Sequence, residues 1–222
     1  LEGLPNLRFA GLLTHAGHTY SAGSPEGIRA VYRQSVERMN FLRKRLLVEG
    51  LTETRISVGD TPGCTLSEDL GKVDEIRPGN FIFYDACQLQ FGVCTPEDIA
   101  VALACPIVAV HPERSEVVVY GGAVHLSLNP VAGMQPAAYG LVCLPEGGSW
   151  GQPLPGAVVR GLSQEHGILK VRPEDLPAFP VGGLVCIRPA HSCLTVSCMR
   201  GYLSLDGEPI EAILYYRLRK LP

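Results

Sequence analysis

The amino-acid sequence lacks both the long apolar segment typical of membrane proteins and the positive charge typical of nucleic-acid-binding proteins. Its longest apolar run, from Ile99 to Val110, contains Pro106 and is shorter than the roughly 20 residues that span a bilayer. No basic segment followed by an apolar one opens the chain, so no signal peptide is visible. A net charge of -3 and a pI near 6.1 give no basic surface for nucleic acid. We therefore expect neither a membrane nor a nucleic acid as a partner.

The sequence also lacks any pair of cysteines separated by two residues, a spacing found in many zinc and redox motifs. Its eight cysteines are irregularly spaced, and 46% of the residues are apolar. A chain of this length and composition folds around a hydrophobic core and does not need disulfide bonds. We expect reduced, buried thiols in a cytoplasmic protein, with a set of disulfide bonds as the alternative.

The first part of the chain shows strands alternating with a helix. Residues 7–14 predict a buried strand and residues 55–58 a second one, and residues 73–85 hold two more apolar stretches. Between the first two strands, Ser24 and Pro25 predict a helix start, and Gly50 predicts its end after Glu49. The expected apolar side of this helix consists of Ile28, Val31, Val36, Met39, Leu42, Leu46 and Leu47. This order predicts parallel strands.

After about residue 95 the sequence consists of short strand-like runs separated by glycine and proline. This pattern of short strand-like runs predicts a small β barrel or sandwich. The expected strands are residues 107–110, 116–120, 157–162, 167–171, 184–188, 194–198 and 213–218. Residues 129–155 are expected to form a long surface loop. The predicted fold class is α/β plus all-β, with one domain at residues 1–95 and a β domain at 96–222.

Chemically useful side chains gather in four segments that follow predicted strands, where sites form in parallel α/β units. The first segment holds His191 and Cys193, which would point to the same side if the chain were extended. Imidazole nitrogen and thiolate sulfur both bind Zn²⁺, and two protein ligands leave positions open for water or substrate. The alternative is a buried thiol beside a histidine whose hydrogen bonds are satisfied.

The second segment, Gly59-Asp60-Thr61-Pro62-Gly63, is a glycine loop after a strand, with backbone N–H groups and a Thr61 hydroxyl that suit a phosphate. An ordinary turn is the alternative for this loop. The third segment offers the fixed charge of Arg77, followed by a close backbone approach at Gly79. Its alternative is a surface turn with a solvated arginine.

The fourth segment, residues 14–20, holds His15, His18 and Tyr20 after the first predicted strand. Two imidazoles and a phenol can stack on a ring or exchange protons. The alternative is one packed histidine and one exposed histidine. Residue pattern alone does not choose between these possibilities.

Taken together, the segments resemble a known family. The strings occur in the order His15-Ala-Gly-His18-Thr-Tyr20, Val58-Gly-Asp-Thr-Pro62, EIRPGNFIFYD at 75–85, Glu165-His166-Gly167 and Pro189-Ala-His-Ser-Cys193. This order resembles the eukaryotic-type D-serine dehydratases and the related D-threonine aldolases. Both belong to the alanine-racemase-like class of pyridoxal phosphate (PLP) enzymes. The resemblance covers nearly the whole chain, and its final His-x-Cys is the most discriminating part.

The resemblance implies a role for each segment. Residues 1–95 would form the later part of a PLP-binding (β/α)8 barrel, and residues 96–222 a β domain with a metal site. His191 and Cys193 would bind Zn²⁺, and Arg77 matches the position at which alanine racemases carry an arginine near the pyridine nitrogen. The remaining residues implied to contact PLP are His15 against the ring, Tyr20 in the pocket, and Gly59, Asp60, Thr61, Gly79 and Asn80 at the phosphate.

The implied reaction is β-elimination, which converts D-serine to pyruvate and ammonia. Zn²⁺ would make the β-hydroxyl a better leaving group, and PLP would take up the electron pair from the Cα–H bond. D-serine or a similar D-3-hydroxy amino acid is therefore the expected substrate, and the full-length relatives imply a homodimer. The aldolases are expected to carry Asp in place of Cys193 and a harder ion such as Mn²⁺.

The resemblance also implies a lysine that bonds to PLP, and this lysine lies in the first barrel strand of the family. The four lysines of this chain are Lys44, Lys72, Lys170 and Lys220, and none lies in that context. A complete (β/α)8 barrel takes about 250 residues. We therefore expect the sequence to be the C-terminal part of a longer enzyme, with no catalytic lysine of its own. A D-threonine aldolase and a non-catalytic fragment are the alternatives.

Overall fold

The computed structural model describes residues 4–199 and 201–211, which form two compact units. The first unit comprises residues up to 82 together with 91–93, and the second comprises residues 83–90 and those from 94 onward. Across the described residues, no helix is both long enough and apolar enough to cross a membrane. The two units are described separately below.

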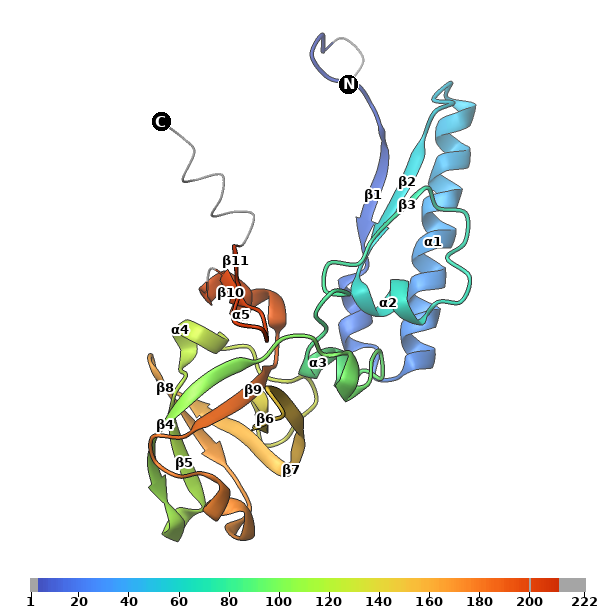
Figure 1. The fold of residues 1–222 in the computed structure, drawn as a ribbon. Helices are drawn as coiled ribbons and strands as arrows, with labels where there is room; N and C mark the ends of the chain where they lie inside the picture. The colour runs from blue at the N-terminus through green and yellow to red at the C-terminus, as the bar shows by residue number, and fades with distance from the viewer. Residues whose placement is uncertain (1–3, 200, 212–222) are drawn as a thin grey trace, which may run out of the picture. The chain divides into compact units, whose positions relative to one another are not determined.

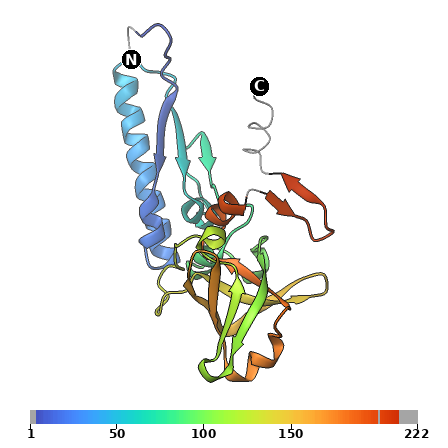
Figure 2. The ribbon, with the colours of Figure 1, turned by 90° about the vertical axis from the view of Figure 1, so that its left-hand side faces the viewer.

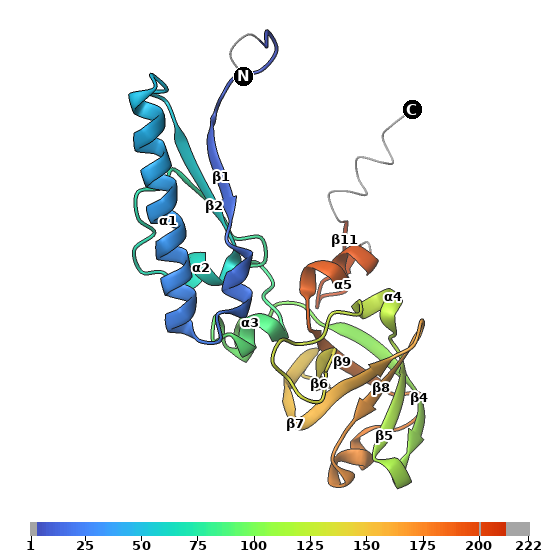
Figure 3. The ribbon, with the colours of Figure 1, turned by 180° about the vertical axis from the view of Figure 1, so that it is seen from behind.

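The first unit is a three-stranded parallel sheet with one long helix packed beside it (Figures 1 and 3). The sheet order is β1 (Gly11–His15), β2 (Arg55–Gly59) and β3 (Glu75–Arg77), which confirms the predicted parallel strands. The connecting elements are η1 (Gly17–Ser21), α1 (Pro25–Val48) and the short α2 (Thr61–Leu66). All three strands run in one direction, so their carboxyl ends meet at one edge of the sheet.

Helix α1 begins and ends where its capping residues predict. The Ser24 hydroxyl accepts a hydrogen bond from the Gly27 backbone N–H at 3.1 Å, and Gly50 follows the helix with a φ of +90°. The helix buries Tyr32, Val36 and Met39 in a core with sheet residues such as Ile56 and Val58. The predicted apolar side was wrong at Leu42 and Leu47, which are 46% and 53% exposed.

The second unit is a closed antiparallel barrel in the order β4-β5-β8-β7-β6-β9 (Figures 1 and 2). Its strands are β4 (Leu103–His111), β5 (Glu116–Tyr120), β6 (Gly140–Glu146), β7 (Ser149–Leu162), β8 (His166–Lys170) and β9 (Leu184–Pro189). The helices of this unit are α3 (Ala86–Gln90), η2 (Pro96–Asp98), η3 (Pro112–Arg114), α4 (Ala123–Leu126), η4 (Pro173–Ala178) and α5 (Ser192–Met199). A separate hairpin pairs β10 (Gly201–Leu203) with β11 (Pro209–Glu211).

Among the described residues, the buried side chains of the barrel core are mostly aliphatic. Strand residues such as Val119, Val159, Leu169 and Ile187 are fully buried, and Phe179 packs with them. Alternate residues of β5 and β8 are buried and exposed, as expected for strands with one face toward a core. The structure therefore confirms the predicted combination of an α/β part and an all-β part.

Two predictions in the second unit were wrong. Residues 129–155 are not one long loop, because β6 and the start of β7 lie within them. Residues 194–198 are not a strand but lie within helix α5, because an apolar run this short does not distinguish strand from helix. The strand predicted at 213–218 lies outside the described residues.

Candidate functional site

Three of the sequence-predicted residues form one row across the parallel sheet of the first unit. His15 on β1 aligns with Gly59 on β2, and Gly59 aligns with Arg77 on β3. These residues end their strands, so the row lies at the carboxyl edge of the sheet. This edge is where parallel α/β sheets place ligands.

Arg77 is held in place across this edge. Its Nε donates a hydrogen bond to the Ser57 hydroxyl at 2.7 Å, and its Nη2 donates one to the Thr14 carbonyl at 2.8 Å. The guanidinium lies against Gly59, where a Cβ would come within 3.0 Å of Nη1. Gly59 thus leaves room for the guanidinium, which provides a fixed positive charge with about one third of its side chain exposed.

Thr61 and Asn80 connect the loops that follow β2 and β3. The Thr61 hydroxyl accepts a hydrogen bond from the Asn80 backbone N–H at 2.9 Å, and both residues are buried. A hydroxyl that accepts one hydrogen bond can still donate its own hydrogen. At the neighbouring Gly79, a Cβ would meet no atom within 4 Å, so a ligand could approach the backbone there.

Asp60 is a structural acceptor within the same loop. Its Oδ1 accepts hydrogen bonds from the Gly63 backbone N–H at 2.6 Å and from the Thr19 hydroxyl at 3.0 Å. Asp60 is 1% exposed, and burial raises the pKa of its carboxyl although these hydrogen bonds lower it. Its Oδ1 thus caps the start of α2, whereas its Oδ2 is buried without a hydrogen-bond partner among the described residues.

The aromatic ring of Tyr20 lies near His15 and next to the ring of Phe91. The His15 and Tyr20 ring centroids are 6.2 Å apart, and Phe91 meets Tyr20 edge to face at 5.9 Å. His15 and His18 are both exposed, whereas Tyr20 is partly buried. These rings provide an apolar surface next to the fixed charge of Arg77, a combination that suits a flat anionic ring compound.

The second candidate site lies in the second unit, at the start of α5. His191 immediately precedes this helix, and Cys193 is its second residue. The segment is helical from Ser192 and not extended, so the same-side geometry of an extended chain does not apply. Both side chains are accessible: His191 is partly exposed and Cys193 is exposed. Desolvation raises the pKa of the Cys193 thiol, and the nearby Asp85 carboxylate raises it further.

Asp85 is a site residue that sequence analysis did not single out. It is 0% exposed, and its Oδ2 accepts a hydrogen bond from the Ser192 backbone N–H at 3.1 Å. The same oxygen lies 3.7 Å from Nδ1 of His191. The only signal in the sequence was its place at the end of the string at 75–85.

Tyr202 on β10 also belongs to this site and was not predicted. Burial raises the pKa of its hydroxyl, and Cys193 raises it further. The centroid of its ring lies 5.3 Å from that of the Phe83 ring.

Residues 4–199 and 201–211 include no group of three or more His, Cys, Asp or Glu placed to hold a metal ion. His191 and Cys193 carry a nitrogen and a sulfur donor, the kinds of atom that can bind Zn²⁺.

The lysines within the described residues do not lie at either candidate site. Lys44 is exposed on α1, and Lys72 is exposed in the loop before β3. Lys170 on β8 donates a hydrogen bond to the Arg114 carbonyl. Lys220 lies outside the described residues.

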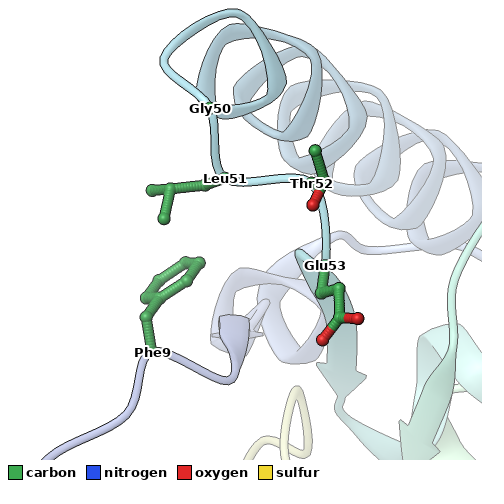
Figure 4. A pocket seen from close by; sticks show the side chains of 5 residues that line it. All are labelled: Phe9, Gly50, Leu51, Thr52 and Glu53. Atoms are coloured by element: carbon green, nitrogen blue, oxygen red, sulfur yellow. The ribbon is translucent and has the colours of Figure 1, made fainter.

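Surface hollows of the first unit lie away from its candidate site. One hollow is lined by Phe9, Leu51 and neighbouring loop residues, and Figure 4 shows the Phe9 ring facing Leu51 across it. These residues precede β1 and β2, so they lie at the amino ends of the strands. Another hollow is formed by α1 side chains that include Phe41 and Leu42. Neither hollow holds a residue predicted to bind a cofactor or a metal.

Comparison of the sequence with known proteins gives consistent matches. Residues 100–205 match the family model of the putative serine dehydratase domain. The chain is 30% identical over 209 residues to D-threo-3-hydroxyaspartate dehydratase from Delftia sp. strain HT23, covering 91% of this chain and 54% of that protein. It is 30% identical over 211 residues to D-serine dehydratase from Dictyostelium discoideum, covering 90% and 52%. The chain thus spans about half the length of these curated relatives.

Solved structures show the same fold. The Delftia dehydratase aligns with a TM-score of 0.83 at 30% identity, covering 92% of this chain and 56% of that one. A variant of that enzyme, in which a cysteine is replaced by alanine, is described in a metal-free form and aligns with a TM-score of 0.82. An alanine-racemase-like protein from Idiomarina loihiensis aligns with a TM-score of 0.80 at 30% identity, covering 90% and 54%. Residues 100–205 thus match the putative serine dehydratase domain, and the chain has the fold of the C-terminal part of alanine-racemase-like proteins.

Proposed function

We propose that this chain is the C-terminal portion of a PLP- and Zn²⁺-dependent dehydratase that converts D-serine, or a similar D-3-hydroxy amino acid, to an oxo acid and ammonia. The observation that carries the proposal is the accessible pair His191 and Cys193 at the start of α5, within a serine dehydratase domain. The Delftia relative supports it, since its cysteine variant is described as metal-free. A cytoplasmic location is part of the proposal and fits the free cysteines of the described residues.

The residues of the second unit fit a zinc ion. His191 and Cys193, two positions apart at the start of α5, offer nitrogen and sulfur donors that suit Zn²⁺, and the buried Asp85 carboxylate beside His191 is typical of the residues that surround such ligands. Zn²⁺ bound there would supply a Lewis acid for the departing β-hydroxyl group. His191 and Cys193 would contribute two ligands and leave the remaining positions to water or substrate.

The residues of the first unit fit PLP through Arg77, Thr61 and the backbone at Gly79 and Asn80. PLP, when bound, supplies an electron sink for deprotonation at Cα. Arg77 would direct its fixed charge at the pyridine ring, and the Thr61 hydroxyl would donate to the phosphate. The remaining contacts proposed are His15 and Tyr20 at the ring, and Gly59 and Asp60 through the backbone of the phosphate loop. The Asp60 carboxylate keeps the loop in shape and does not face the phosphate in this proposal, because it already caps α2.

The substrate class follows the relatives and the metal ligands. The relatives named above act on D-serine and on D-threo-3-hydroxyaspartate, two D-amino acids with a 3-hydroxyl group. Thiolate at position 193 favours Zn²⁺ over a harder ion, which supports dehydration over the aldol cleavage considered from sequence. Dehydration of D-threo-3-hydroxyaspartate is the second candidate activity, since that relative is as similar to this chain as the D-serine dehydratase is.

The test is a dehydratase assay on the protein purified from its natural gene, with PLP and Zn²⁺ supplied. We expect 2-oxo acid and ammonia from D-serine or from D-threo-3-hydroxyaspartate, and the preferred substrate decides between the two candidates. His191→Ala and Cys193→Ala should remove both zinc binding and activity. Cys198→Ala is the matched control, because Cys198 is an exposed cysteine of the same helix. Absence of product from both substrates in the metal- and PLP-loaded protein would refute the proposed function.

A further inference from the structure

Asp85 connects two helices through the two oxygens of one buried carboxylate. Its Oδ1 accepts a hydrogen bond from the Gln88 backbone N–H in α3 at 2.9 Å. Its Oδ2 accepts one from the Ser192 backbone N–H, at the first residue of α5. Because the side chain is 0% exposed, these contacts fix the position of Oδ2 next to His191.

His191 turns Nδ1 toward this fixed oxygen. The distance from Nδ1 to Oδ2 is 3.7 Å, which is longer than a hydrogen bond but places the Nδ1 side of the ring next to the carboxylate. In a neutral imidazole, a proton on Nδ1 leaves the lone pair on Nε2. The nitrogen that can bind a metal is then the one on the side of the ring opposite Asp85.

We propose that Asp85 is a positioning residue of the metal site: it holds His191 with Nδ1 protonated and Nε2 available to Zn²⁺. The inference rests on the proposed function, since it assumes that His191 binds the metal. Carboxylates that accept a hydrogen bond from a ligating histidine recur in zinc sites and raise the basicity of the ligand. Asp85 has a second positioning effect, because by capping α5 it also fixes the turn that carries Cys193.

The variant Asp85→Asn tests this role. Asparagine keeps the shape and one capping oxygen but removes the charge that favours the proton on Nδ1. We expect Zn²⁺ to bind about 10- to 100-fold more weakly, measured by competition with a chromogenic chelator. Asp98→Asn is the matched control, because Asp98 also accepts a backbone N–H at a helix start in the second unit, from Thr95 immediately before η2. Wild-type zinc affinity in Asp85→Asn would overturn the inference.

A second measurement uses the unchanged protein, so it does not depend on the folding of the variant. With cadmium as a spin-active substitute for zinc and nitrogen-labelled histidine, NMR coupling identifies which ring nitrogen of His191 bonds to the metal. Coupling to Nε2 supports the role of Asp85, and coupling to Nδ1 overturns it. A different result would show that His191 is not a zinc ligand at all: the His191→Ala variant would then bind zinc as tightly as the wild type does.

Discussion

The Thr61 hydroxyl accepts a hydrogen bond from the Asn80 backbone N–H at 2.9 Å, which joins the loop after β2 to the segment after β3. The two residues are 19 positions apart in the chain and are both buried. This contact lies just beyond the carboxyl edge of the sheet, where His15 and Arg77 each align with Gly59. A single side chain therefore links the two segments, and in the proposed function its hydroxyl also donates to the phosphate.

Thr61→Val is expected to destabilise the first unit and to weaken binding of PLP. Valine has nearly the shape of threonine but leaves the Asn80 N–H without this acceptor, a change that costs about 1–3 kcal/mol in a buried position. Thr61→Ser keeps the hydroxyl and should preserve most of the stability and binding. Urea unfolding and PLP titration measure the two effects. Equal behaviour of the valine and serine variants would contradict the prediction.

Arg77→Lys is expected to weaken PLP binding even though it keeps the positive charge. The guanidinium bonds to both the Ser57 hydroxyl and the Thr14 carbonyl, and a lysine ammonium cannot reproduce this fork. Loss of one such internal hydrogen bond costs the folded protein about 1 kcal/mol, and a charge that is no longer held in position should bind PLP less tightly. Arg33→Lys on the exposed side of α1 is the control and should bind PLP normally. Spectroscopic titration with PLP compares the variants, and unchanged affinity in Arg77→Lys would count against its role.

Asp60 is expected to make the stability of the first unit depend on pH. Burial raises its pKa, so the folded protein holds this proton more tightly than the unfolded chain. The associated stability is present below the ordinary pKa of about 4 and is lost as the pH rises through the raised value. Asp60→Asn does not ionise and keeps a capping oxygen, so its stability relative to the native protein should increase from about pH 4 to neutral pH.

Urea unfolding at several pH values measures this effect, with Glu53→Gln as a control at an exposed carboxylate. A difference between Asp60→Asn and the native protein that stays constant with pH would show that the folded-state pKa of Asp60 is not raised.

Cys193 is expected to react with iodoacetamide more slowly than Cys198 near neutral pH. Both cysteines are exposed on α5, but desolvation and the Asp85 carboxylate raise the pKa of Cys193 and reduce its thiolate fraction. Added Zn²⁺ should slow the reaction of Cys193 further and leave Cys198 unaffected. Peptide mass spectrometry follows each site separately. Equal protection of the two cysteines by zinc would indicate that the metal does not bind selectively at Cys193.

The elements with clear end signals could be predicted from sequence. Ser24 and Gly50 mark the ends of α1 through local hydrogen bonding and backbone conformation, which need no distant contacts. The row formed by His15, Gly59 and Arg77 follows from parallel strand order, because strand ends that share an edge come together whatever their loops do.

The predictions that failed concern elements and residues whose structure depends on tertiary contacts. Strand β7 was missed at its start because Gly151, Pro153 and Pro155 interrupt its pattern, and its pairing with β6 contains register shifts. The residues at 194–198 include threonine and valine, which favour strands in isolation. They form a helix whose first N–H is accepted by Asp85, 107 positions earlier. Asp85 and Tyr202 were missed as site residues for the same reason, since no local pattern relates them to His191 and Cys193.

The sequence position of Asp85 has a consequence for anyone who expresses the barrel by itself. The second unit is discontinuous: residues 83–90 belong to it, while 91–93 belong to the first unit. A gene fragment that starts at residue 94 or 96 encodes all six barrel strands but omits Asp85. Helix α5 in such a fragment would begin without its carboxylate acceptor. A failure of that fragment to bind zinc would then be explained by the missing Asp85 and would not test His191 and Cys193 as ligands. A fragment intended to report on His191 and Cys193 therefore has to begin before Phe83.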